Sequence, residues 1–246
     1  MQNARYVSND TFRRLPMPRV VRRRSHRTAA TALLLMWSTL SSGCVSYTVG
    51  QGAETVAPYE KERGVSANMV PITLNDGVTD HPTYRPSLDA EFRYGVDERT
   101  DVGVRVTSVS GVMLSWKRQL TAADTSSTPE NRVRTAIMLA GGVLNFAEHA
   151  SFEATLITSG AWSTYGQPYG AVRVMAVAPL NATARKDDPA GGIAFGFLFG
   201  DRQNSIGPEL GVYYDRSTLG LNPHRIIVIP SLVVRRSGIT GFGRRF

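Results

Sequence analysis

Residues 88–106 read LDAEFRYGVDERTDVGVRV, and this stretch decides the fold. Apolar residues from Leu88 to Tyr94 alternate with charged ones, and a second alternating run extends from Val102 to Val106. A period of two places successive side chains on opposite faces of a β-strand. Charged residues at 97–99 separate the two runs and favour a turn. The stretch therefore predicts a β-hairpin with one apolar face and one polar face.

The same alternation recurs through most of the chain. Further alternating runs lie at 112–117, 151–156, 171–176, 193–199 and 209–214, and we expect additional strands at about 62–70, 131–144 and 225–236. No stretch after the first 43 residues has the pattern of a long amphipathic helix. Sequential hairpins at this spacing favour an antiparallel up-and-down barrel over a sandwich. We predict an all-β fold, a barrel of about 8–10 strands.

The N-terminus has the pattern of an export signal. A basic stretch, Arg19 to Arg27, leads into the apolar stretch Thr28 to Leu40, which ends just before the single cysteine of the chain, Cys44. A helix needs about 20 apolar residues to cross a bilayer, so this stretch is too short to span and fits a cleavable signal peptide. An exported chain with one cysteine forms no internal disulfide, so Cys44 needs another role.

The residues before the cysteine suggest that role. Ser42-Gly43-Cys44 resembles the lipobox of bacterial lipoproteins, although Ser41 stands where leucine is usual. The resemblance implies cleavage after Gly43, acylation of Cys44 by membrane lipid, and handling by the export and lipidation machinery. We therefore expect a signal peptide at 1–43, a lipid anchor and tether at 44–60, and a barrel domain at 61–246. The alternatives are an ordinary secretory signal with a buried free cysteine, or an uncleaved N-terminal membrane anchor.

The formal charge of +8 belongs almost entirely to the leader. The first 43 residues hold eight arginines and one acid, which leaves 20 of the 28 basic and 19 of the 20 acidic residues in 44–246. A domain with a net charge of +1 has no long-range field to attract phosphate. We therefore expect no nucleic-acid partner.

Three features indicate that the polar face of the barrel points inward. That face is rich in glycine and alanine, which suit a crowded lumen better than a solvated surface. Aromatic residues near the run ends would form girdles at two membrane interfaces: Tyr94, Trp116, Trp162, Tyr169 and Tyr214. The polar face also carries charges of both signs, five acids and six bases: Asp89, Glu91, Glu153, Glu209, Asp215, Arg93, Arg105, Lys117, Arg132, Arg134 and Arg173.

These charges predict an ion-paired interior, and the alternative is a narrow polar channel or ligand pocket. A barrel of roughly ten strands is narrower than a porin, which has 16–18. As interior charges we single out Asp89, Glu91, Arg93, Arg105, Lys117, Glu153, Arg173 and Glu209. The alternative to a membrane barrel is a soluble periplasmic barrel, tethered by lipid, that binds an apolar ligand.

A family resemblance supports the membrane interpretation. Residues 92–104, FRYGVDERTDVGV, resemble the strand–turn–strand signature of small, largely uncharacterised bacterial outer-membrane β-barrel proteins. The terminal Phe246 is similar to the aromatic C-terminus that the barrel-assembly machinery reads, although Arg244 departs from that pattern. The resemblance implies an outer-membrane location and no particular reaction.

The sequence offers no catalytic or metal-binding pattern. The histidines after the leader, His81, His149 and His224, fall in predicted loops without zinc-ligand spacing. Ser163 lies in a predicted turn and lacks the Gly-x-Ser-x-Gly spacing of a nucleophile elbow. We expect a structural or interaction protein with no enzymatic activity, cofactor or metal. An envelope hydrolase is the distant alternative, and no protein partner is indicated.

Overall fold

A computed structural model describes residues 46–73, 82–108, 110–121, 133–181, 189–215 and 225–238. The predicted signal peptide, Gly43, Cys44 and Phe246 lie outside the described residues, as do His81, His224 and Arg132. The side chain of Asp215 also lies outside that description.

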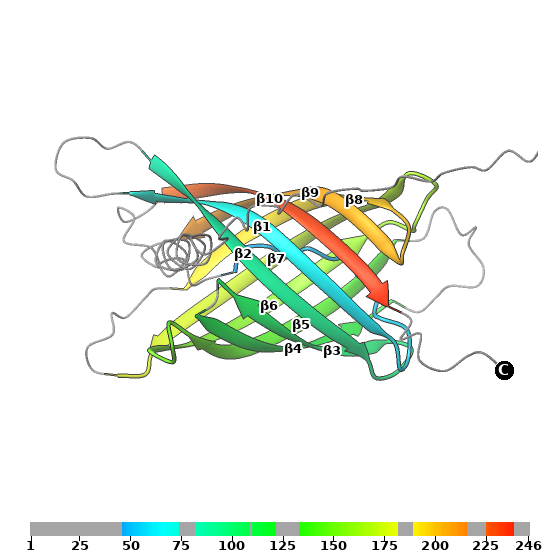
Figure 1. Cartoon of the computed structure of the whole chain (residues 1–246), viewed down its shortest axis with the longest axis horizontal. Coiled ribbons are helices and arrows are strands. Elements are labelled where there is room, and N and C mark those ends of the chain that lie inside the picture. Colours follow the sequence, from blue (N-terminus) through cyan, green and yellow to red (C-terminus); the bar gives the residue numbers. More distant parts are fainter. Residues whose placement is uncertain are drawn as a thin grey trace, which may run out of the picture. The chain divides into compact units, whose positions relative to one another are not determined.

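The described chain forms a closed antiparallel barrel in which each strand pairs with the next, and β1 pairs with β10 (Figure 1). The strands are β1 (Lys61–Thr73), β2 (Pro82–Gly95), β3 (Thr100–Thr107), β4 (Gly111–Gln119), β5 (Arg134–Leu144), β6 (His149–Ser159), β7 (Gly166–Pro179), β8 (Ala190–Gly200), β9 (Asn204–Asp215) and β10 (Arg225–Gly238). The predicted fold class and strand number are confirmed. Within the described ranges, no helix is both long enough and apolar enough to cross a membrane.

The hairpin predicted for residues 88–106 forms between β2 and β3. In the β2–β3 register Glu91 is opposite Arg105 and Phe92 is opposite Val104. The N–H of Val96 donates to the carbonyl of Thr100 at 2.9 Å and closes the turn. Closure of the barrel brings the start of β1 beside the end of β10, with Lys61 opposite Gly238.

The alternation sorts apolar side chains outward and most charged side chains inward. On β3, Val102 and Val104 are each 39% exposed, whereas Arg105 between Val104 and Val106 is 5% exposed. On β8, Phe195 is 58% exposed and Ala194 only 1%. This distribution is the reverse of a barrel folded in water, which buries its apolar face. Most strands have 9–14 residues and so reach or exceed the roughly 9–11 residues that a tilted strand needs to cross a bilayer.

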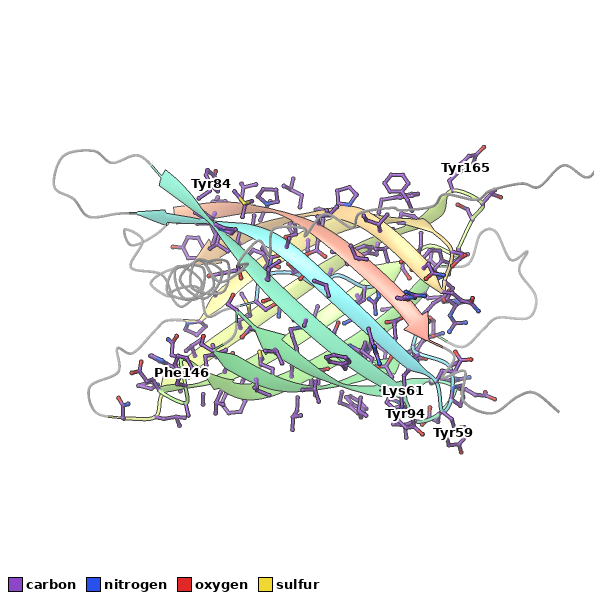
Figure 2. The ribbon with its side chains drawn as sticks, in the orientation of Figure 1. Tyr59, Lys61, Tyr84, Tyr94, Phe146 and Tyr165 are labelled. Carbon is purple, nitrogen blue, oxygen red and sulfur yellow. The ribbon has the colours of Figure 1, made fainter. Side chains whose placement is uncertain are left out.

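Exposed aromatic side chains lie at both ends of the barrel. Figure 2 shows Tyr84 and Phe146 at one end, and Tyr59, Tyr94 and Tyr165 at the other. Of the five aromatics predicted for the girdles, Tyr94 and Tyr214 are exposed, and Trp116 is half-buried.

Two girdle assignments were wrong. Tyr169 is 5% exposed and points into the lumen, since it shares a strand face with Ala171 and Arg173. Trp162 packs against a buried cluster of apolar residues instead of facing outward.

Glycines on the inner face make room for two tyrosine rings. A Cβ at Gly196 would lie 2.3 Å from the Tyr169 ring, and one at Gly192 would lie 2.3 Å from the Tyr213 ring. The small residues that suggested a crowded lumen therefore accommodate aromatic side chains from neighbouring strands.

Candidate functional site: the filled lumen

The chain before β1 runs through the inside of the barrel (Figure 1, blue). Residues 46–56, which we call the inner segment, are all buried except Glu54, which is partly exposed. They belong to the 44–60 stretch that we expected to be a tether. Because the inner segment contacts the inward side chains of most strands, it is a structural part of the barrel.

Side chains of the strands donate hydrogen bonds to the backbone carbonyls of Tyr47 and Thr48 in the inner segment. The hydroxyl of Tyr213 donates to the Tyr47 carbonyl, and the two rings meet edge to face with centroids 5.1 Å apart. The guanidinium groups of Arg105 and Arg173 donate to the carbonyl of Thr48 at 3.4 and 3.2 Å. Side chains from β3, β7 and β9 therefore converge on two consecutive carbonyls.

Glu209 and Arg235 hold the next turn of the inner segment. The Glu209 carboxylate accepts the N–H of Val49 at 2.9 Å and that of Gly50 at 2.6 Å, and also accepts the Tyr169 hydroxyl at 2.7 Å. Arg235 donates to the Gly50 carbonyl at 2.6 Å. A buried carboxylate needs such donors, because an unpaired charge in a dry interior is strongly disfavoured.

The last part of the inner segment is bound by β3, β4 and β6. Lys117 donates to the carbonyls of Gly52 and Glu54 at 3.4 and 2.6 Å. Ser159 accepts the N–H of Ala53 at 3.0 Å. Asp101 accepts the N–H of Val56 at 3.0 Å. Buried backbone groups outside a sheet ladder need such partners, so the strand side chains substitute for secondary structure.

Glycines give the inner segment its path. Gly50 has a φ of +66°, in the left-handed region that favours glycine. A Cβ at Gly52 would lie 2.3 Å from the Gln167 side chain. At the exit, a Cβ on Gly95 would lie 2.0 Å from the carbonyl of Ala57, so the chain passes directly over β2 before β1 begins.

Five inward charges on β2, β3, β6 and β7 form a continuous chain of ion pairs. Glu91 pairs with Arg93 at 3.0 Å and with Arg105 at 3.3 Å. Arg105 also lies 3.9 Å from Glu153, which pairs with Arg173. Each charge thus has an opposite charge as a neighbour, as burial requires.

The network extends to the Asp101 carboxylate. Arg93 pairs with it, and Lys117 lies 3.5 Å away. It therefore links the network to the inner segment, through its own bond to Val56 and through the bonds of Lys117.

All eight charges that we singled out from the sequence are buried in the lumen: Asp89, Glu91, Arg93, Arg105, Lys117, Glu153, Arg173 and Glu209. Asp89 accepts from Ser46 at 2.8 Å and from Asn68 at 2.9 Å. Arg134 pairs with Glu54 of the inner segment. Sequence reasoning missed Asp101 and Arg235, although the period of two places them on the same faces as Arg105 and Val233.

The rest of the lumen is apolar. One cluster joins Tyr47 to Met113, Met175 and Tyr213, and a second joins Val49 and Ala53 to residues that include Met138 and Leu198. The inner segment therefore contributes to both clusters as well as to the charge network.

Two small cavities lie beside the inner segment in the described part of the lumen. One of about 30 Å³ lies beside Gly52 and Trp162, and one of about 20 Å³ lies beside Thr48, Asp89 and Arg105. Each has room for a water or two. Neither approaches the roughly 300–1,000 Å³ of a small-molecule site.

No metal-binding cluster is found in the described ranges. They contain no cluster of three or more potential metal-ligating side chains. His149, which we predicted in a loop, is the first residue of β6 and is buried. Ser163 lies in the turn between β6 and β7, where its hydroxyl donates to the Gly166 carbonyl at 2.8 Å.

No protein-family model matches the sequence, and no curated protein matches it. Among solved structures, the chain is similar to the COG4313 outer membrane channel from Pseudomonas putida F1, with 10% identity and a TM-score of 0.48 over 78% of this chain and 100% of that one. It is also similar to the outer membrane protein OprG from Pseudomonas aeruginosa, with 12% identity and a TM-score of 0.28 over 76% and 97%. A third structure is Ail, the attachment invasion locus protein of Yersinia pestis, with 7% identity and a TM-score of 0.24 over 72% and 96%. At these identities the likeness extends to the fold alone.

Proposed function

We propose that this chain is an outer-membrane lipoprotein whose β-barrel crosses the membrane and is closed by its own inner segment. One observation carries the proposal: the outward residues of the strands are largely apolar, while the inward ones include a paired charge network. Lipid is the solvent that makes such an outer face favourable. Aromatic residues at both ends of the barrel fit the two interfaces of a bilayer.

The role that fits this lumen is structural or interaction-based. Arginine side chains, apolar clusters and the inner segment occupy the space that a channel would need. The same filling speaks against the alternative of a soluble barrel that holds an apolar ligand. Such a barrel would also expose the apolar outer face to water at a cost of about 25 cal/mol per Å².

The lipid anchor belongs to the same proposal. Ser46 contacts Asp89, and Val56 contacts Asp101 near the turn between β2 and β3, so the inner segment runs toward the end of the barrel where β1 begins. Acylation of Cys44, two residues before Ser46, is the part of the proposal that rests on the sequence.

Membrane fractionation with carbonate washing, combined with gel mobility before and after boiling, tests this proposal. A membrane barrel resists extraction and migrates as a compact species until it is boiled. Extraction by carbonate, together with identical mobility in both samples, would overturn the proposal in favour of a peripheral domain.

A further inference from the structure

A groove lies on the outer face of the barrel over β1 to β4. Its volume is about 640 Å³, and its apolar lining includes Phe92, Val102 and Leu114. These side chains are 50%, 39% and 64% exposed, so the groove opens outward and is separate from the filled lumen. Its volume lies within the range of about 300–1,000 Å³ that is typical of small-molecule sites.

Basic residues border this groove on β1 and β10. Lys61 and Arg63 line it, and Arg63 lies over the Phe92 ring at 5.8 Å from its centroid. Arg236 is directly opposite Arg63 in the β1–β10 register, and both side chains are exposed. Like charges directly opposite each other on one face of a sheet repel, so this pair has an unfavourable interaction that an anion would relieve.

Acids in the described residues do not neutralise this pair. Glu62 pairs with Arg235 on the inner face, and Glu60 forms no ion pair with a described residue. Lys61 also lies at the end of the barrel that carries Tyr59 and Tyr94 (Figure 2). In a membrane barrel, such aromatic residues lie at the level of the lipid head groups.

We propose that this surface binds one anionic phospholipid. Its phosphate would lie between Arg63 and Arg236, and an acyl chain would occupy the groove. The inference rests on the proposed membrane location of the outer face. Arginine suits this role because its guanidinium binds phosphate through two parallel hydrogen bonds.

Native mass spectrometry of the purified protein in a neutral detergent tests the site, with dioleoyl phosphatidylglycerol and dioleoyl phosphatidylcholine as probes. One arginine near an anionic head group strengthens binding by about fivefold. We therefore expect the preference of the wild type for phosphatidylglycerol to fall by about 25-fold in the double variant R63Q/R236Q.

The matched control is Arg118→Gln. Arg118 is exposed at the same end of the barrel, opposite Thr100, but it does not line the groove. Arg118 also has an acid nearby, Asp97. The pKa of Asp97 is lowered mainly by the hydrogen bond from the backbone N–H of Arg99 and to a lesser degree by the charge of Arg118. We expect this variant to keep the lipid preference of the wild type.

Three results would overturn the inference. The first is equal binding of both lipids by the wild type, and the second is an unchanged preference in R63Q/R236Q. The third is that inorganic phosphate abolishes the preference of the wild type for phosphatidylglycerol, whereas sodium chloride of equal ionic strength leaves it unchanged. That result would assign the site to a free anion. Failure of the membrane location itself would look different, because neither lipid would bind and boiling would not change the gel mobility.

Discussion

Glu209 accepts the backbone N–H of Gly50 at 2.6 Å, and this bond joins β9 to a chain segment that precedes the barrel by sequence. Glu209 faces the lumen and is 2% exposed. Its bond places the inner segment among the paired charges, so the barrel and its filling are one hydrogen-bonded unit. The first three predictions concern this unit.

Removal of the inner segment should open the lumen. A variant lacking residues 46–56 loses the backbone that Arg105, Lys117 and Arg173 bind, and leaves a water-accessible path lined by their charges. Planar-bilayer recordings should show no stable single-channel steps for the wild type and defined steps for the deletion variant. Reproducible steps from the wild type would contradict a closed lumen.

Breaking the ion-pair network should destabilise the barrel. Arg105→Met removes pairs with Glu91 and Glu153 and the bond to the Thr48 carbonyl. The expected loss is about 3 kcal/mol, the lower end for a broken buried pair, because Arg93 remains beside Glu91. Thermal unfolding in detergent measures this loss, with the exposed Arg118→Met as the matched control.

A second substitution, Glu91→Gln, should recover part of the stability that Arg105→Met loses. It removes the Glu91 carboxylate, which has lost its ion pair with Arg105. A double variant whose losses simply add would show that the two side chains do not interact.

Two glycines of β8, Gly196 on the inner face and Gly191 on the outer face, should differ in their tolerance of a methyl group. Gly196→Ala would place its Cβ 2.3 Å from the Tyr169 ring, so we expect a loss of about 1–3 kcal/mol from overpacking. Gly191→Ala is the control, since the nearest atom to its Cβ is the Arg173 carbonyl oxygen at 3.8 Å. Equal unfolding temperatures for the two variants would show that the Tyr169 ring does not occupy this position.

Acylation of Cys44 remains a prediction from the leader and the Ser42-Gly43-Cys44 ending. Palmitate labelling of cells should mark the wild type and leave Cys44→Ser unlabelled and unprocessed. Equal labelling and processing of both proteins, or no label on either, would contradict the anchor.

The sequence predicts the barrel well because the strand signal is local. An alternation of period two shows both the strand and its faces, so Val104 and Arg105 could be assigned to opposite sides without knowledge of their neighbours. The same rule could have placed Tyr169 inward, since it lies two residues from Ala171 and four from Arg173. Its position near a run end suggested a girdle instead.

The inner segment could not be predicted in this way. Its small polar residues carry no period, and its burial depends on side chains from β3, β4, β6, β7, β9 and β10 that are distant in sequence. A segment whose backbone bonds go to side chains has the same local composition as a linker. The partners in the charge network are likewise set by strand register and closure. Pairs within the β2–β3 hairpin, such as Glu91 and Arg105, lie close in sequence, whereas Arg105 and Glu153 do not.

The proposed function requires that the outer face of this barrel contacts lipid. The test uses fluorophores attached to single cysteines that replace Phe195 or Ala194 in a Cys44→Ser background. Each labelled protein is placed in vesicles that contain spin-labelled lipids. The two positions are chosen because they are neighbours on β8 with opposite exposure. Lipid-borne spin labels should quench position 195 strongly and position 194 weakly. Strong quenching at 194 with little at 195, or none at either, would contradict a lipid-facing outer surface.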